Sequence, residues 1–80
     1  MYERIRNLRE DRDMTQTQVA RRLSIHQTTY SDYELGNLNI PVPILDQLAD
    51  LFGTSIDYLV NRTDEPKPYP KKPLRPEAKQ

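Results

Sequence analysis

The stretch TQTQVARRLSIHQTTYSDYELG, from Thr15 to Gly36, decides the fold that we predict for this chain. Its first residues fit a capping box, in which the Thr15 hydroxyl accepts a hydrogen bond from the backbone of Gln18 and the Gln18 side chain bonds back. We therefore expect one helix to begin near residue 16 and to end before residue 24. A second helix is expected from about Gln27 to residue 35, because the glycine at position 36 is the residue type that most often ends a helix.

The rest of the first 60 residues predicts three further short helices. Ile5 and Leu8 share one face of a helix over about residues 2–12. Apolar residues from Val42 to Phe52 follow helical spacing after a proline-containing loop, and Ser55 is placed to cap a short last helix. No stretch alternates apolar and polar residues as a half-buried strand does. The fold class that we predict is all-α, a compact bundle of five short helices.

Composition changes sharply after Val60. Five prolines lie between residues 66 and 76, and large apolar side chains are nearly absent from there on. Such a segment cannot bury enough apolar surface to fold by itself. We expect residues 61–80 to form a flexible, disordered Pro- and Lys-rich tail, which places the boundary of the folded domain at residue 60.

The composition also excludes several classes of protein. The chain has no cysteine, so it has neither disulfides nor thiolate chemistry. Its start is highly charged, and no apolar run approaches the roughly 20 residues that span a bilayer. With His26 as the only histidine, and Gly36 and Gly53 as the only glycines, it offers no catalytic triad, metal-ligand cluster or phosphate-binding loop. We expect a cytoplasmic protein that is not an enzyme, does not contact a membrane and needs no cofactor or metal.

The net charge is zero, but the charges are unevenly placed. Residues 1–24 hold six arginines and four acids, residues 25–60 hold five acids and no lysine or arginine, and residues 61–80 hold six bases and three acids. Positive charge therefore sits at the two ends of the chain. A neutral total argues against a nonspecific DNA coat, but it leaves room for a specific DNA reader with a few well-placed positive groups.

Residues 8–60 resemble helix-turn-helix regulators of the Cro and lambda-repressor type, also called the XRE family. The resemblance rests on the relative positions of several features taken together. These are Gln16 at a helix start, Ala20, Ile25 in the turn, the helix ending Tyr33-Glu34-x-Gly36 and the segment LADLFGTSIDYLV. The resemblance implies a lambda-repressor-like DNA-binding domain over residues 1–60, with the helix-turn-helix at about residues 15–35. It further implies a sequence-specific transcriptional regulator that binds double-stranded DNA and acts as a repressor.

The helix that begins at Gln27 has an outward polar arc, given a turn of about 100° per residue. Tyr30 and Tyr33 lie on the opposite arc and should pack in the core. The resemblance implies that the outward residues contact base edges in the major groove, and these residues are Gln27, Thr28, Ser31 and Asp32. Glutamine can bond adenine, and threonine can contact thymine, without any positive charge. For Asp32 two readings stay open, namely a bond to the amino group of cytosine and a solvated acid that repels phosphate.

Positive charge is needed at phosphates, where contacts position a protein without reading sequence. The residues that we predict for this role are Gln16, Thr17, Arg21, Arg22, His26 and Thr29. The resemblance implies that Gln16 also braces the reading helix, and that Arg9 and Glu34 form a structural ion pair. Three departures from the family pattern affect this surface. His26 stands where a serine cap is common, and Asp32 stands where a basic or amide residue is common. Ser24 replaces a turn glycine, which costs about 1 kcal/mol if that position is left-handed.

One short reading helix with few positive contacts should bind DNA weakly, so we expect a homodimer that addresses half-sites about 34 Å apart. The candidate dimer surface is the apolar end of the domain, a use that the family often makes of its last helix, and it comprises Ile56, Tyr58, Leu59 and Val60. A different class of function stays open. The acidic middle and the basic, proline-rich end also favour an antitoxin-like protein-interaction module whose tail binds a partner protein.

Overall fold

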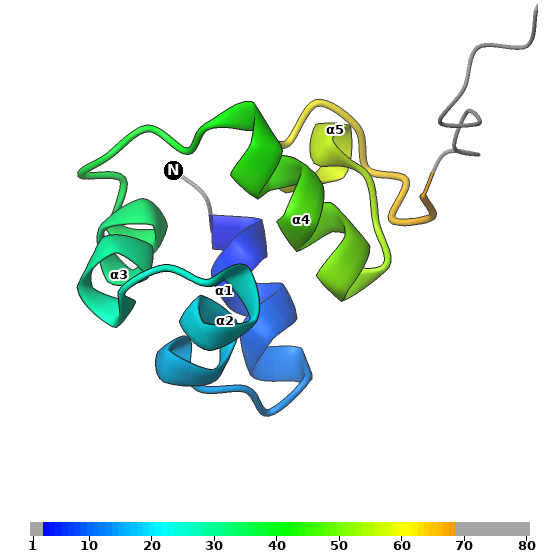
Figure 1. Ribbon diagram of the computed structural model, residues 1–80. Coiled ribbons are helices and arrows are strands. Elements are labelled where there is room, and N and C mark those ends of the chain that lie inside the picture. The colour runs from blue at the N-terminus through cyan, green and yellow to red at the C-terminus, as the bar shows by residue number, and fades with distance from the viewer. Residues whose placement is uncertain (1–2, 69–80) are drawn as a thin grey trace, which may run out of the picture.

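The computed structural model describes residues 3–68, and within them the chain forms five helices and no strand (Figure 1). The helices are α1 (Glu3–Asp11), α2 (Gln16–Leu23), α3 (Gln27–Leu35), α4 (Val42–Phe52) and α5 (Ile56–Leu59). The predicted all-α bundle of five short helices is confirmed. Of the predicted disordered tail, residues 69–80 lie outside the described residues. No helix in the described part is long and apolar enough to cross a membrane.

All five helices contribute to one core, with α1 in the middle of the bundle (Figure 1). α1 packs against α3, α4 and α5, while α2 packs against α3 and α4. The largest fully buried side chains come from every helix, and they are Ile5, Val19, Tyr30, Leu48, Phe52 and Leu59. Tyr30 and Tyr33 are both buried, so the inward arc of α3 faces the core. The same packing fixes which arc of α3 faces solvent.

Capping groups set the starts of the short helices. The Thr15 hydroxyl accepts from the backbone N–H of Gln18 at 3.1 Å, and the Gln18 side chain accepts from the Thr15 N–H at 2.8 Å. The predicted capping box at α2 is therefore present. Ser55 caps α5 in a similar way, whereas His26 at the start of α3 makes no side-chain cap. The first N–H groups of α3 thus receive no side-chain acceptor from their cap residue.

The turn between α2 and α3 depends on a left-handed residue that is not glycine. Ser24 ends α2 with φ 60° and ψ 40°, and its backbone N–H reaches back to the carbonyls of Ala20 and Arg21. Gly36 and Gly53 have the same role at the ends of α3 and α4, with φ of 82° and 65°. A side chain is disfavoured in this region because its Cβ approaches the carbonyl oxygen, so Ser24 holds the turn at an energetic cost.

Replacing Ser24 with glycine should therefore stabilise the protein by about 1 kcal/mol, because glycine adopts a left-handed conformation without steric cost. Urea denaturation followed by helical circular dichroism measures the change. Ser24→Ala is the matched control, since alanine keeps the Cβ and should leave the strain in place. Equal stability of the glycine and alanine variants would contradict this account of the turn.

Arg4 of α1 binds the segment that follows α5. Its guanidinium donates to the carbonyl oxygens of Tyr58, at 3.2 Å, and of Thr63, and it pairs with the Asp64 carboxylate at 2.6 Å. It also lies 4.2 Å from the centre of the Tyr58 ring, a cation–π contact. Asn61 turns the chain here with φ 68°. Contacts with the bundle thus continue beyond α5 as far as Asp64.

A chain that ends after Val60 should lose about 1 kcal/mol of stability relative to a chain that ends after Asp64, mainly because the Arg4 bond to the Thr63 carbonyl is lost. The ion pair to Asp64 adds little, since that carboxylate is almost fully exposed. Ending the chain after Asp64 should leave stability as in the full chain, because the remaining predicted tail has little apolar surface to bury. Thermal denaturation of the three chains measures both differences. Equal melting temperatures for all three would show that the Arg4 contacts do not contribute to stability.

Candidate nucleic-acid interface

The start of α3 presents polar side chains to solvent. Gln27 and Thr28 are exposed, and Ser31 and Asp32, one turn further along, are half-exposed. The opposite side of the helix holds the buried tyrosines of the core. The four predicted base-contact residues therefore share one accessible strip of α3.

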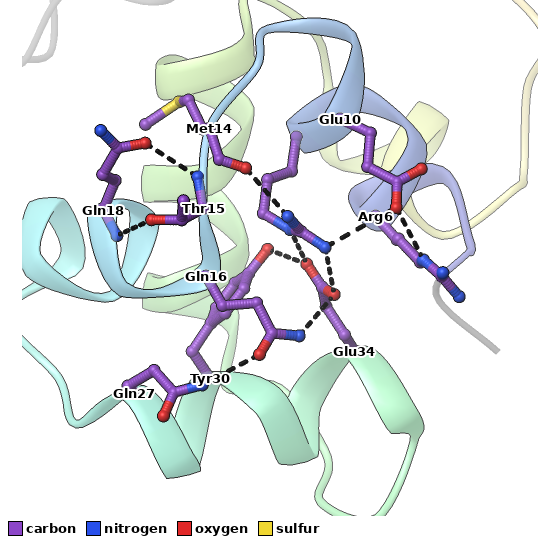
Figure 2. Close-up of polar contacts among 10 residues, drawn as sticks. Arg6, Glu10, Met14, Thr15, Gln16, Gln18, Gln27, Tyr30 and Glu34 are labelled. Atoms are coloured by element: carbon purple, nitrogen blue, oxygen red, sulfur yellow. Dashed lines mark hydrogen bonds and ion pairs between the residues drawn. The ribbon is translucent and has the colours of Figure 1, made fainter.

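A chain of side-chain hydrogen bonds leads from Gln27 into the protein. The Gln27 amide nitrogen donates to the Gln16 oxygen at 3.0 Å, and the Gln16 amide nitrogen donates to Glu34 Oε1 at 3.0 Å. Figure 2 shows Gln16 between Gln27 and Glu34. A carboxylate only accepts, so Gln16 must turn its nitrogen toward Glu34 and its oxygen toward Gln27. The orientation of both amides is fixed as a result.

The Glu34 carboxylate is the buried anchor of this chain. It accepts two bonds from Arg9, at 2.7 and 3.2 Å, one from the Tyr30 hydroxyl and one from Gln16. The Glu34 side chain is 4 % exposed and that of Arg9 is 12 % exposed. Arg9 also donates to the Met14 carbonyl at 2.9 Å. The anchor therefore joins α1, the turn before α2, and α3.

The environment shifts the pKa values of all three ionisable groups in the anchor. Burial would raise the pKa of Glu34, but the hydrogen bonds from Arg9, Tyr30 and Gln16 together outweigh it, and the pKa lies below its ordinary value. The bond to Glu34 raises the pKa of Arg9, even though burial opposes it. Burial and the bond to Glu34 raise the pKa of the Tyr30 hydroxyl. Glu34 and Arg9 are thus both charged, and Tyr30 is neutral, at neutral pH.

A shallow hollow between α2 and the start of α3 brings together several of the predicted phosphate-contact residues. Its rim includes Thr17, Arg21 and His26, and Gln27 lines it as well. Arg22 is exposed on α2 but lines a different hollow, between α2 and α4. Thr29 is half-buried, so it offers less surface than the others. Arg21 of α2 is the arginine that lines this hollow, and α3 itself contributes no lysine or arginine.

Sequence reasoning missed the partner of Asp32. The Asn37 side-chain nitrogen donates to Asp32 Oδ1 at 3.2 Å, and the Asn37 backbone N–H bonds to the Asp32 carbonyl at 2.9 Å. Asn37 lies directly after the glycine that ends α3, a position from which a side chain can fold back over the last turn. Asp32 is therefore held at the end of the strip by a neutral donor.

The predicted dimer surface needs a correction. Leu59 is 1 % exposed and belongs to the core, so it cannot form part of an outer surface. Ile56 and Val60 are half-buried, and the Tyr58 ring lies against the Arg4 guanidinium. α5 is a single turn packed on α1 and α4, and its apolar side chains fill the space beneath it. The surface that remains on α5 is small.

Comparisons with known proteins agree with the fold. The helix-turn-helix family model matches residues 5–59. The chain is 36 % identical over 69 residues to the Uncharacterized HTH-type transcriptional regulator YobD of Bacillus subtilis (strain 168), a match that covers 85 % of this chain and 62 % of that protein. It is 33 % identical over 61 residues to the Cryptic phage CTXphi transcriptional repressor RstR of Vibrio cholerae, covering 76 % of this chain and 55 % of that protein. The chain thus spans about 60 % of the length of these relatives. No solved structure gives a significant match.

Proposed function

Because this chain belongs to the helix-turn-helix family of the Cro and lambda-repressor type, we propose that it is a sequence-specific DNA-binding transcriptional repressor that inserts α3 into the major groove. Both relatives carry the name of transcriptional regulators, one of them a repressor. The observation that carries the proposal is the exposed amide of Gln27, which Gln16 holds in one orientation at the open start of α3. We expect such a regulator to act in the cytoplasm and to catalyse no reaction.

The bonding of Gln27 suits an adenine. Its amide nitrogen has two hydrogens, and the bond to Gln16 uses one of them. The other hydrogen and the amide oxygen remain for adenine N7 and the adenine N6 amino group, the pairing that glutamine makes in the major groove. Thr28 stands next to it, where its methyl group would meet a thymine. The fixed amide reduces the entropy that Gln27 would otherwise lose on binding.

Phosphate contacts would come from the α2 side of the surface. The uncapped N–H groups at the start of α3 carry a partial positive charge. Arg21, Thr17 and His26 lie around the same hollow, and Gln16 keeps one amide hydrogen free of the bond to Glu34. These few groups imply modest affinity for one copy. We therefore propose that a homodimer binds two half-sites one helical turn apart.

A selection from randomised duplexes with the full chain tests the proposal. We expect the bound pool to converge on two half-sites centred about 34 Å apart, with an adenine within each. A complex that uses about four phosphates should then lose affinity with salt with a log–log slope near −3.6. A bound pool without sequence preference would count against a DNA reader and in favour of a protein-interaction module.

A further inference from the structure

The end of α3 carries an acid and an amide that are bonded to each other at the surface. Asn37 is exposed and Asp32 is half-exposed. The Asn37 amide nitrogen donates to Asp32 Oδ1 at 3.2 Å, and the Asn37 backbone N–H bonds to the Asp32 carbonyl at 2.9 Å. Gly36 allows this arrangement, because its left-handed φ of 82° turns the chain back over the last turn of the helix. The Asn37 side chain is therefore held beside the Asp32 carboxylate.

Both side chains can bond to a further partner. An amide nitrogen has two hydrogens, and the bond to Asp32 uses one of the hydrogens of Asn37. A carboxylate has two oxygens that accept, and within residues 3–68 the bond from Asn37 is the one that the Asp32 side chain receives. The pair therefore presents a hydrogen-bond acceptor and a hydrogen-bond donor side by side, 3.2 Å apart.

The edge of a base pair in the major groove presents the complementary pattern. The cytosine N4 amino group is a donor, and it lies next to the guanine O6 acceptor, to which it is itself bonded at about 3 Å. The adenine N6 amino group lies next to thymine O4 in the same way. The carboxylate can accept from the amino group while the amide donates to the neighbouring oxygen, because the spacing in the protein matches the spacing in the base pair.

The atom on the other side of the amino group separates cytosine from adenine. In adenine this atom is N7, an acceptor that would face the carboxylate. In cytosine it belongs to a C–H group, which has no lone pair. Where the base is thymine or guanine, the carboxylate would meet only acceptors. A carboxylate at this place therefore favours cytosine over adenine, and adenine over the other two bases.

We propose that Asp32 and Asn37 together read one C·G base pair, with cytosine N4 donating to Asp32 and Asn37 donating to guanine O6. The inference rests on the proposed function, because it requires α3 to lie in the major groove. Asp32 follows Gln27 by about 7.5 Å along the helix, at 1.5 Å per residue. At about 3.4 Å per base pair, the C·G pair then lies about two base pairs from the adenine proposed for Gln27. Sites without the C·G pair are disfavoured, since there the negative charge finds no donor and still repels phosphate.

Nuclear magnetic resonance of the free full chain tests the bond between the two side chains. Asp32→Ala should shift the resonances of the Asn37 side-chain amide, because its charged acceptor is lost. Asn39 is the matched control, since it is an exposed asparagine of the same loop. An Asn37 amide that shifts no more than the Asn39 amide would overturn the proposal, whatever DNA sequence the protein selects.

Duplexes that vary at one base pair test the reading. In the duplex selected by the full chain, affinity should fall in the order C·G, A·T, then G·C and T·A, with C·G about tenfold above the last two. Asp32→Asn should move A·T to the top, because an asparagine amide bonds adenine N6 and N7 together. Replacing the guanine with 7-deazaguanine should leave the affinity unchanged, since the proposed contact uses O6. An unchanged order for Asp32→Asn would overturn the proposal.

Replacing Asn37 tests its part in the reading. Asn37→Ala should reduce the preference for C·G about tenfold and leave the preference at the base pair of Gln27 unchanged, whereas Asn39→Ala should change neither. A loss for Asn37→Ala that is equal on every duplex would overturn the proposal. If the full chain selects no duplex, the proposed function fails and this inference fails with it. If it selects a duplex in which no base preference depends on Asp32, this inference alone fails.

Discussion

Replacing Glu34 with glutamine is expected to lower the free energy of unfolding by about 3 kcal/mol or more, because it removes the charged partner of the buried Arg9 guanidinium and leaves only the longer contact to the half-exposed Glu10, at 3.9 Å. Arg9 is 12 % exposed, and Glu34 accepts both of its paired bonds. A domain of this size has only about 5–15 kcal/mol of stability in total. The loss should therefore appear as a large fall in the urea concentration at the unfolding midpoint.

Glu10 provides the matched control for that substitution. It pairs with Arg6 at 3.1 Å on the surface of α1, where both side chains are at least half exposed, and its other contact, to Arg9, is longer at 3.9 Å. The same change, Glu10→Gln, should cost less than about 0.5 kcal/mol, since exposed pairs are screened by water. Similar losses at the two positions would show that burial does not set the strength of the Arg9–Glu34 pair.

The same carboxylate makes a pH prediction. The folded state holds the pKa of Glu34 below its ordinary value, so the unfolded chain binds a proton at a higher pH than the folded chain does. The stabilisation from Glu34 is complete above the ordinary glutamate pKa of about 4.3, and it is lost as pH falls through the lower folded value. Urea denaturation between pH 7 and pH 3 should give a steeper acid loss for the native chain than for Glu34→Gln. Parallel curves would contradict the assignment.

Replacing Gln27 with alanine should cost about 1–3 kcal/mol at one base pair of the preferred duplex and should relax the preference there, because the paired bonds to adenine are lost. The measurement is the affinity for the selected duplex and for duplexes altered at each position. Gln47→Ala is the control, as it removes an exposed glutamine from α4. An equal loss of affinity for all duplexes, with the order of preference unchanged, would mean that Gln27 contacts a phosphate or does not contact the DNA.

A double substitution separates the contact of Gln27 with a base from the effect of Gln16 on the orientation of Gln27. Gln16 holds the Gln27 amide, so Gln16→Ala should weaken the base preference even though Gln27 is still present. If the two residues act as a unit, the combined variant should lose little more than Gln27→Ala alone. Additive losses would mean that Gln16 acts at the DNA backbone without orienting Gln27.

Local signals in the sequence were enough to predict the helices. The Thr15–Gln18 capping box marks the start of α2, and the glycine at position 36 marks the end of α3. Both signals lie within three or four residues of the helix end, so no distant part of the sequence was needed. The inward tyrosines of α3 followed from its helical period. The base and phosphate contacts of the surface remain predictions.

Three features depended on distant parts of the chain, and the sequence could not place them. α5 is four residues long, too short for a period to indicate that Leu59 points inward. Arg4 bonds to residues more than 50 positions away in the sequence, and no local pattern predicts that contact. The bond between Gln16 and Glu34 joins α2 to α3 across 18 positions of the chain, so it depends on how the two helices pack.

Given the proposed function, the hydrogen-bonded path from Gln27 to Glu34 restricts which substitutions can change the DNA sequence that the protein recognises. Replacing Gln27 with a residue that lacks an amide removes the donor to the Gln16 oxygen, and Gln16 in turn bonds to the Arg9–Glu34 charge pair that joins α1 and α3. New specificities are therefore most accessible through Thr28 and Ser31, whose side chains make no hydrogen bond within residues 3–68, and changes at Gln27 should be made together with Gln16. At Gln27, therefore, the proposed base contact and the packing of the domain depend on the same hydrogen bonds.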